Sequence, residues 1–332
     1  MAVIGATGYA GATAISLLAA HPMARVVRAT SRSYAGQKLA GVYPGLDLDL
    51  VLEGEMDPGD AEVVVAALPH GMTGALAGRW LAEGRTVVDL GADFRLKDAA
   101  AYATWYGAEH PDPALLDQAV FALPEVAAGS LRGAHLLACP GCYSTAAILA
   151  LHPSAMSGLV RPDFIVDAAS GISGAGRSLA LPNHFAEAAE DFRAYGVAGH
   201  RHQAEMFQAL ARDGQSPRLT FVPHLVPMVR GILATCYLDL ADGVDFSALE
   251  SAYHDAYAGS PFVSVTAAPP RTKEVAGTNH CHVHLARQGD RVIAFAALDN
   301  LVKGAAGQGV QALNLAMGWP EDAGLQQAPR WP

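Results

Sequence analysis

The pattern in the chain best suited to chemistry is Cys-Pro-Gly-Cys, residues 139–142, which is followed by the helical sequence YSTAAILAL. Such a pair can be a redox couple with C-x-x-C spacing, half of a zinc site, or a single nucleophile at the start of a helix. A zinc site needs a second pair of ligands, and the other two cysteines, Cys236 and Cys281, stand alone in strand-like sequences. The pattern favours the nucleophile, and the redox couple stays open as the alternative.

Cys142 stands where the chain passes from the sharp bend at Pro140-Gly141 into the expected helix, which we expect to break at Pro153. The partial positive charge and the N–H groups at a helix start favour a thiolate there, and they can hold an oxyanion. Cys139 ends a buried strand, where cysteine is usually an inert packing residue. We therefore interpret Cys142 as the nucleophile.

A glycine-rich turn, GATGYAG, lies between the first strand-like and the first helical sequence. Glycine permits the tight turn and lets the backbone approach a pyrophosphate at the helix N-terminus, although any tight strand–helix turn also uses glycine. The position at the start of a strand–helix unit favours dinucleotide binding. The predicted contacts are Gly5, Thr7, Gly8, Tyr9, Ala10 and Gly11.

The end of the second strand discriminates between the two nicotinamide cofactors. NAD-binding units usually carry an acidic residue there for the ribose 2′-hydroxyl. This chain has Ser31, Arg32 and Ser33 instead, a set suited to a 2′-phosphate. The sequence therefore predicts NADP(H), with an incidental polar loop as the alternative.

A thiolate beside a nicotinamide predicts one kind of reaction. The sulfur attacks an acyl carbon and expels a leaving group, and the resulting thioester accepts hydride and collapses to an aldehyde. If the leaving group is phosphate, the site also needs cationic side chains.

The elements that position these residues divide the chain into two halves. In the first half, strand-like runs alternate with helical sequences, which predicts a parallel sheet with covering helices. The expected strands are 2–5, 24–30, 61–68, 86–90 and 134–139, and the expected helices 11–21 and 72–84.

The second half has runs of strands with few helices, which predicts a mostly antiparallel sheet. The expected strands are 164–170, 218–226, 231–240, 280–287 and 291–298, with a hairpin between the last two and a helix at 246–259. The helical sequence 303–318 is expected to return to the first domain. The predicted fold class is α/β: a Rossmann domain, 1–141 with 304–332, and an α+β domain, 142–303.

Bulk composition excludes several classes of protein. The 332 residues are 51% hydrophobic and carry a net charge of −10, with no basic tract for nucleic acid. No apolar run approaches the ~20 residues of a membrane span, and no leader precedes the first strand. Four cysteines form no disulfide framework, so we expect a cytoplasmic protein with neither nucleic acid nor membrane as partner.

Six ordered motifs resemble one family. GATGYAG, CPGCYSTA, SGISGAGR, GHRHQAE, FVPHLVPMVRGI and DNLVKGAAGQ resemble the N-acetyl-gamma-glutamyl-phosphate reductases, part of the aspartate-semialdehyde dehydrogenase superfamily. The resemblance implies NADPH-dependent reductive dephosphorylation of N-acetyl-glutamyl 5-phosphate to the 5-semialdehyde in arginine biosynthesis. It also implies that the second domain serves dimerisation and substrate binding, usually within a homotetramer.

The resemblance assigns catalytic roles residue by residue. Cys142 matches the nucleophile, and GHRHQAE offers His200 and His202 as acid and base. We favour His202 as the acid–base residue, with Glu205 on the same helix face to orient the imidazole, and place His200 among the substrate contacts.

The resemblance also assigns binding residues. Arg95 in DFRL matches a phosphate-binding arginine, and Arg230 in PMVRG matches one that holds a carboxylate, although either can be a surface ion pair. The remaining predicted contacts are Ser170 for substrate, and Ser173, Gly174, Leu68, Pro69 and Asn300 for the cofactor.

Two alternatives and one decoy stay open. The related carrier-protein-linked aminoadipyl-phosphate reductases of lysine biosynthesis share most motifs, and a non-catalytic NADP sensor would keep the fold without the reaction. HCHVHL places His280, His282 and His284 on one strand face, a pattern that is more often half-exposed or at a subunit interface than a metal site. We predict no metal.

Overall fold

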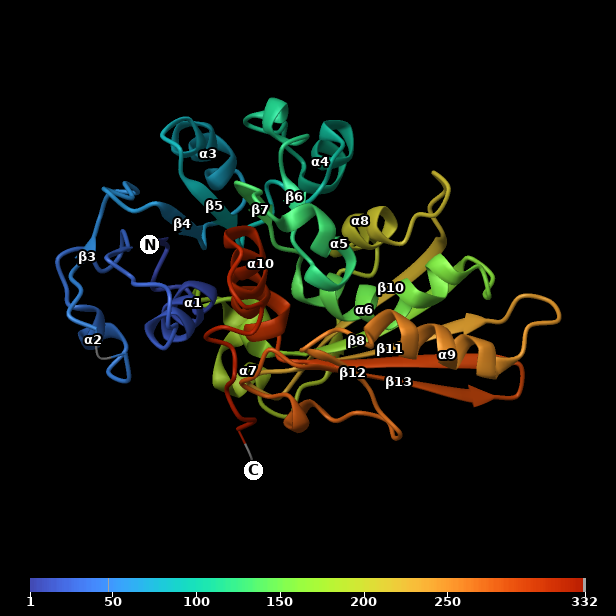
Figure 1. The fold of residues 1–332 in the computed structure, drawn as a ribbon. Helices are drawn as coiled ribbons and strands as arrows, with labels where there is room; N and C mark the ends of the chain where they lie inside the picture. The colour runs from blue at the N-terminus through green and yellow to red at the C-terminus, as the bar shows by residue number, and fades with distance from the viewer. Residues whose placement is uncertain (47, 331–332) are drawn as a thin grey trace. The chain divides into compact units, whose positions relative to one another are not determined.

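The computed structural model describes residues 1–46 and 48–330, and its contacts divide the chain into two compact units (Figure 1). The first comprises Met1–Pro140 and Ala305–Gln327, and the second comprises Gly141–Gly304 and the chain end from Ala328. The sequence placed the whole segment 304–332 with the first domain. In the structure the Arg330 N–H donates to the Ala276 carbonyl, so the chain end groups with the second unit.

The first unit is built on a seven-stranded sheet in the order β3-β2-β1-β4-β5-β7-β6, and every paired strand is parallel, which confirms the Rossmann prediction. Its strands are β1 (Ala2–Ile4), β2 (Arg28–Thr30), β3 (Leu52–Glu53), β4 (Val63–Ala66), β5 (Thr86–Asp89), β6 (Val120–Phe121) and β7 (Leu136–Ala138). The sequence missed β3 and β6. Both are two-residue edge strands, too short to show a pattern.

Helices cover this sheet because its central strands are apolar on both faces; all four residues of β4, for example, are buried. The C-terminal helix α10 packs on α1, α5, β5 and β7, as the sequence predicted for the returning segment. The helices of this unit are α1 (Tyr9–Ala19), α2 (Leu39–Val42), α3 (Met72–Ala82), α4 (Ala99–Tyr106), α5 (Pro124–Leu131) and α10 (Gly307–Met317), with a 3₁₀ turn, η1 (Pro113–Leu115).

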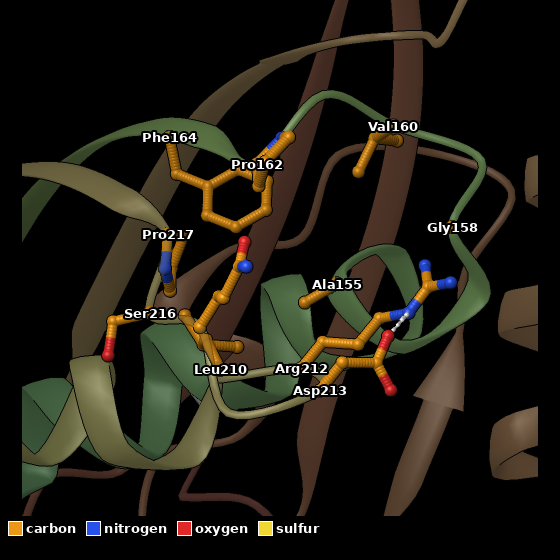
Figure 2. Close-up of a pocket in the computed structure, with 11 residues that line it drawn as sticks. Ala155, Gly158, Val160, Pro162, Phe164, Leu210, Arg212, Asp213, Ser216 and Pro217 are labelled. Atoms are coloured by element: carbon orange, nitrogen blue, oxygen red, sulfur yellow. Dashed lines mark ion pairs between the residues drawn. The ribbon is translucent and has the colours of Figure 1, made fainter.

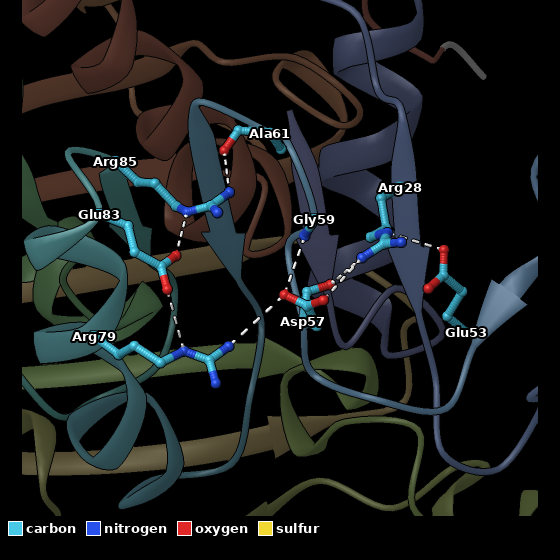
Figure 3. A network of polar contacts seen from close by, with 8 residues as sticks. All are labelled: Arg28, Glu53, Asp57, Gly59, Ala61, Arg79, Glu83 and Arg85. Atoms are coloured by element: carbon cyan, nitrogen blue, oxygen red, sulfur yellow. Dashed lines mark hydrogen bonds and ion pairs between the residues drawn. The ribbon is translucent and has the colours of Figure 1, made fainter.

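A chain of ion pairs crosses one surface of the first unit (Figure 3). Arg28 of β2 pairs with Glu53 of β3 at 2.9 Å and with Asp57 at 3.3 Å, and Asp57 also faces Arg79 of α3 at 3.7 Å. Most of these side chains are substantially exposed, so each pair contributes at most about 1 kcal/mol. Their role is to tie the short edge strand β3 to the sheet.

The second unit is a seven-stranded sheet in the order β12-β13-β14-β11-β8-β10-β9. Four of its pairings are antiparallel and two, β8–β10 and β12–β13, are parallel, which confirms the mostly antiparallel prediction. The strands are β8 (Asp163–Gly171), β9 (Arg193–Ala194), β10 (Arg218–Val226), β11 (Ile232–Asp239), β12 (Val263–Val265), β13 (Cys281–Gln288) and β14 (Arg291–Leu298).

Helices α6 (Cys142–Ser157), α8 (His202–Ala209) and α9 (Phe246–Tyr257) pack on one side of this sheet (Figure 1). The unit also holds α7 (Phe185–Ala188), a π-helical turn η5 (Val302–Ala306), and 3₁₀ turns η2 (Ile172–Ala175), η3 (Leu181–Asn183) and η4 (Thr272–Glu274). In the part of the chain that the structure describes, no helix is long and apolar enough to cross a membrane.

The predicted helix break at Pro153 is wrong, because α6 continues to Ser157. A proline inside a helix leaves the carbonyl four residues earlier without its N–H partner. Here that carbonyl belongs to Leu149, and the Tyr257 hydroxyl of α9 donates to it at 2.6 Å. The sequence of α6 alone does not show this compensation, since the donor lies 108 residues away.

Candidate active site

Cys142 is the first residue of α6 and is partly exposed, whereas the other three cysteines are buried. None of the four forms a disulfide. Burial raises the pKa of both Cys139 and Cys236, which keeps these sulfurs protonated and unreactive. Among the described cysteines, only Cys142 is both partly exposed and at the start of a helix. This placement supports the single nucleophile over the redox couple.

No group of three or more metal-ligating side chains gathers anywhere in residues 1–46 and 48–330. His280 precedes β13 and does not lie on its face, which corrects the three-histidine stripe. His282 faces Glu274 at 3.6 Å, and His284 Nδ1 contacts the Thr266 carbonyl at 2.7 Å. The strand therefore presents two histidines engaged with other groups.

His202 lies directly against the turn that carries Cys142, the predicted nucleophile. A Cβ added to Gly141 would lie only 2.1 Å from His202 Nε2, so the imidazole occupies the space that any other residue at 141 would fill. Gly141 is the N-cap residue of α6 and immediately precedes Cys142. The absence of a side chain at Gly141 thus lets the His202 imidazole of α8 pack against the residue that precedes Cys142.

Glu205 is hydrogen-bonded to the backbone of the same turn. Its Oε2 accepts a hydrogen bond from the Gly141 N–H at 2.7 Å, and the side chain is fully buried. His202 and Glu205 are three residues apart on α8, so both lie on the face that meets Gly141, as their spacing predicted. The bond found for Glu205 fixes the backbone beside Cys142. Its predicted role in orienting the imidazole stays a prediction.

Aromatic side chains form a wall beside Cys142. Tyr143 follows Cys142, donates its hydroxyl to the His224 carbonyl at 2.7 Å, and lies ring to ring with His200, His202 and Phe221. Tyr195 donates to the Tyr143 hydroxyl at 3.3 Å. The sequence analysis missed both tyrosines, although the position of Tyr143 next to Cys142 was a usable signal.

The surroundings of His200 determine its protonation state. Burial, helped by the neighbouring Arg201, lowers the pKa of His200 to about 4, so His200 is neutral at neutral pH. Its Nδ1 accepts the His202 backbone N–H at 3.2 Å. Burial also raises the pKa of Tyr195 to about 12, which keeps that hydroxyl protonated. His200 is therefore suited to packing and hydrogen bonding rather than to proton transfer.

The π-helical turn η5 packs against another side of Cys142. A Cβ on Gly304 would lie 2.8 Å from the Cys142 Cβ, so only glycine allows this approach. The buried Asp299 caps the turn by accepting the N–H groups of Leu301 and Val302 at 2.8 and 3.1 Å. Gly304 and Asp299 were not predicted, because their role depends on packing between distant segments.

Most of the predicted second-unit binding residues meet where two loops run together. The Asn300 amide accepts the Gly231 N–H at 2.8 Å and donates to the Ser173 hydroxyl at 3.0 Å. Arg230 pairs with Asp299 at 3.5 Å and is partly exposed. The loops touch backbone to backbone, since the Gly171 N–H donates to the Gly231 carbonyl. The structure thus brings together Ser170, Ser173, Gly174, Arg230 and Asn300.

In the first unit the predicted dinucleotide residues gather at the carboxyl ends of β1, β2 and β4. Gly5 has φ +85°, and a Cβ on Gly11 would lie 2.3 Å from the Gly5 carbonyl oxygen, so the fold itself requires both glycines. Gly8, the N-cap of α1, has no such neighbour, because the nearest atom to its added Cβ is 3.6 Å away. The packing of the fold therefore sets no steric requirement for glycine at position 8.

The polar residues after β2 lie beside this turn. Ser31 is buried and its hydroxyl bonds that of Thr7 at 2.7 Å, while Arg32 and Ser33 are exposed. Tyr9 is at the exposed surface of α1, Leu68 follows β4 with partial exposure, and Pro69 is exposed. A guanidinium and a hydroxyl are thus presented next to the turn, as a 2′-phosphate would need.

Arg95 is placed differently from the expectation of an accessible phosphate ligand. It is only 8% exposed, and its Nε and Nη2 donate to the carbonyls of Cys139 at 2.7 Å and Leu90 at 3.2 Å. Nearby, burial and the adjacent Asp93 raise the pKa of Asp89 to about 6. In this structure Arg95 braces the end of β7, from which the nucleophile turn continues; phosphate binding by Arg95 stays a prediction.

A cavity of about 310 Å³ lies at the opposite end of α6 (Figure 2). Its lining comes from residues 155–164 and 210–217, with Arg212 paired to Asp213 at 3.3 Å. Ala155, which lines the cavity, lies 13 residues along α6 from Cys142, so at 1.5 Å per residue the cavity is roughly 20 Å from that sulfur. It is not part of the candidate active site.

Comparison with known proteins agrees with this geometry. The chain matches the model of the semialdehyde dehydrogenase NAD binding domain over residues 1–134 and that of the semialdehyde dehydrogenase dimerisation domain over 142–300. The N-acetyl-gamma-glutamyl-phosphate reductase of Dehalococcoides mccartyi strain BAV1 is 46% identical over 329 residues, which is 98% of this chain and 96% of that one. The chain belongs to the N-acetyl-gamma-glutamyl-phosphate reductase family.

Solved structures show the same fold at lower identity. Aspartate semialdehyde dehydrogenase II of Vibrio cholerae superimposes with a TM-score of 0.72 at 16% identity, over 95% of this chain and 96% of that one. The Candida albicans aspartate semialdehyde dehydrogenase, solved with NADP, gives a TM-score of 0.65 at 15% identity, over 95% and 97%. Family membership gives this chain a nucleotide-binding unit and a dimerisation unit.

Proposed function

We propose that this protein catalyses the NADPH-dependent reductive dephosphorylation of N-acetyl-L-glutamyl 5-phosphate to the 5-semialdehyde and phosphate, a step of arginine biosynthesis. The observation that carries the proposal is the placement of Cys142 at a helix start, with His202 packed on the preceding glycine. The 46% identity to a full-length N-acetyl-gamma-glutamyl-phosphate reductase supports the choice of substrate.

The side chains present account for the steps on the protein. His202 takes the thiol proton, and the Cys142 thiolate attacks the acyl carbon, so that the bond from this carbon to the phosphate oxygen breaks and a thioester forms. The first N–H groups of α6 face the developing oxyanion, because a helix start has N–H groups without intrahelical partners. When bound, the dinucleotide supplies the hydride that reduces the thioester carbon. The tetrahedral adduct then releases the aldehyde, and His202 returns the proton to the sulfur.

Binding of the substrate is assigned to the residues around the nucleophile. Arg230, with Ser170, lies on the second-unit loops and is proposed to hold the carboxylate, whereas Arg95 is proposed for the phosphate. Arg230 already faces the buried Asp299, so its guanidinium has a fixed starting position.

NADP(H) is the proposed cofactor, bound on the first unit. The fit is supported by Gly8, where the protein leaves open the space that a Cβ would fill, and by the exposed Arg32 and Ser33 next to it. The similar Candida albicans structure was solved with NADP. We expect the KM for NADPH to be at least about tenfold below that for NADH, as a retained Arg–phosphate contact would give.

We also infer that the protein works in the cytoplasm as a homodimer or homotetramer. A reducing compartment suits an enzyme whose four cysteines form no disulfide. The match to a dimerisation domain over 142–300 supports self-association.

The test uses the reverse reaction, in which semialdehyde, phosphate and NADP⁺ give NADPH. We expect activity with N-acetylglutamate 5-semialdehyde, and a loss of about a thousandfold or more in Cys142→Ser. Cys139→Ser is the matched control and should keep most activity, because that sulfur is buried and protonated.

The other outcomes identify the alternatives. Turnover only with the carrier-protein-linked aminoadipate semialdehyde would move the protein to lysine biosynthesis. Tight NADP⁺ binding with no turnover of either substrate would indicate a sensor, and near-normal turnover in Cys142→Ser would refute the covalent mechanism.

A further inference from the structure

Two buried carboxylates lie near Arg95 where β5 ends in the first unit. Asp89 is the last residue of β5 and Asp93 follows four residues later, and both side chains are fully buried. The two oxygens of Asp93 accept two backbone N–H groups at the start of α3 and the Tyr102 hydroxyl, at 2.6, 2.8 and 3.2 Å. Asp93 is therefore committed to holding α3 and α4 on the sheet.

Asp89 is less completely engaged. Its Oδ1 accepts the Gly91 N–H at 2.9 Å, whereas its Oδ2 has no hydrogen-bond partner among the described residues. A fully buried carboxylate with an open oxygen is costly in its charged form. Burial, and next the adjacent Asp93, raise the pKa of Asp89 to about 6, while Arg95 opposes this shift. Asp89 is therefore neutral below about pH 6 and anionic above it.

The other polar groups that face Asp89 come from three elements. They are the Thr73 hydroxyl of α3, the Tyr102 hydroxyl of α4 and the Cys139 thiol after β7. Burial raises the pKa of both Tyr102 and Cys139, so neither the phenol nor the thiol changes charge near neutral pH. Arg95 stays charged at any pH that the fold survives.

Asp89 and Arg95 are joined through the peptide groups of Cys139. The Asp89 carbonyl accepts the Cys139 N–H at 2.9 Å, and Arg95 Nε donates to the Cys139 carbonyl at 2.7 Å. Arg95 Nη2 donates to the Leu90 carbonyl at 3.2 Å. These carbonyls are neutral acceptors, and a guanidinium bonds more strongly to a charged phosphate oxygen. A buried guanidinium also needs a negative group nearby, and Asp89 supplies one only when it is ionised.

We propose that Asp89 is a positioning residue that sets the affinity for phosphate through Arg95. Ionised Asp89 holds the guanidinium on the two carbonyls, whereas neutral Asp89 leaves it to bind the phosphate. Because ionised Asp89 balances the charge of Arg95, a dianion gains less by binding there, and phosphate binds more weakly as the pH rises through about 6. In the proposed forward reaction phosphate is a product, so ionised Asp89 favours its release. This inference rests on the phosphate role proposed for Arg95.

The test measures sulfate binding by calorimetry on the enzyme saturated with NADP⁺. Sulfate is the probe because it stays a dianion across the range, whereas phosphate itself titrates near neutral pH. We expect Asp89→Asn, which stays neutral, to bind sulfate like the wild type at pH 5 and about tenfold more tightly than the wild type at pH 8. Asp60→Asn, at an exposed position of the first unit, is the matched control for the lost charge and should follow the wild type at both pH values.

A second comparison asks whether Asp89 acts through Arg95. In an Arg95→Gln background, Asp89→Asn should change the Kd for sulfate at pH 8 by less than about twofold; a tenfold change there would mean direct repulsion and would overturn the positioning role. Equal affinities of the wild type and Asp89→Asn at pH 8 would overturn it as well.

The wild type alone keeps the proposal testable if a variant does not fold. Its Kd for sulfate should weaken about tenfold or more between pH 5 and pH 8, and a constant Kd would contradict the proposal. These binding measurements are independent of turnover. An active enzyme without the Asp89 effect contradicts only this inference, and an inactive protein that shows the effect contradicts only the proposed reaction.

Discussion

Two turns of this molecule have nearly the same backbone and opposite surroundings. In the dinucleotide turn, Gly8 is the N-cap of α1 with φ −71° and ψ 160°; in the nucleophile turn, Gly141 is the N-cap of α6 with φ −70° and ψ 154°. Both turns follow a strand of the first sheet and open a helix. An added Cβ would have its nearest neighbour 3.6 Å away at Gly8 but only 2.1 Å away, in the His202 ring, at Gly141.

The difference shows two uses of the same glycine. Neither glycine has a positive φ, so neither is there for backbone conformation. At Gly8 an added side chain would clash with no protein atom, and this is where we propose that the cofactor binds, whereas at Gly141 the missing side chain leaves room for the His202 imidazole. The two turns should therefore respond differently to the same substitution.

The largest effect is expected from removing the imidazole of the nucleophile turn. His202→Asn should lower kcat by about 10²–10⁴-fold, as loss of a general acid–base group does, and should leave the KM for NADPH unchanged. The measurement is the pH dependence of kcat in His202→Asn and in His200→Asn. His200→Asn is the control; because His200 is held neutral, it should lose less activity and keep the wild-type pH profile. The reverse ranking would assign the acid–base role to His200.

Adding a side chain at Gly141 should have the next largest effect on kcat. The Cβ of Gly141→Ala must displace His202, and a misplacement of about 1 Å can cost a hundredfold in rate, so we expect kcat to fall about 10- to 100-fold. The double variant Gly141→Ala/His202→Ala gives the methyl group its space. Its unfolding free energy should therefore exceed the value that additive single substitutions would give. Additive losses would show that the steric conflict lies elsewhere.

The same substitution in the dinucleotide turn should have the smallest effect. The Cβ added by Gly8→Ala clashes with no protein atom, so the melting temperature and kcat should stay at wild-type values while the KM for NADPH rises about tenfold, or ~1.4 kcal/mol. Gly11→Ala is the contrast: its Cβ would lie 2.3 Å from the Gly5 carbonyl oxygen and should destabilise the fold. An unchanged KM in a stable Gly8→Ala variant would place the pyrophosphate away from this glycine.

The sequence predicted the main strands because their patterns are strong. The buried runs of the first sheet and the alternating strands of the second both appear, and β10 and β14 have the predicted bounds. The edge strands β3 and β6 were missed since two residues carry no periodicity. The continuation of α6 past Pro153 was missed because it depends on a tyrosine from another helix.

The candidate site was predictable where chemistry is local and not where it is made by packing. Cys142 next to a helix start, and His202 with Glu205 three residues on, can be recognised within a few residues of sequence. Two contacts join segments that are 64 or more residues apart in the sequence. Gly304 packs against Cys142, and the Gly141 N–H donates a hydrogen bond to Glu205. The predicted binding residues stay predictions until substrate and cofactor are bound.

The distribution of the four sulfurs has a practical consequence. Cys139, Cys236 and Cys281 are enclosed, and Cys142 alone reaches the surface. A mild alkylating reagent applied to the native enzyme should therefore modify one position per chain, and the moles of label incorporated would count the competent subunits in any preparation. Denaturation should then expose the remaining three cysteines. The ratio of label incorporated before and after denaturation would therefore measure the folded fraction of the enzyme.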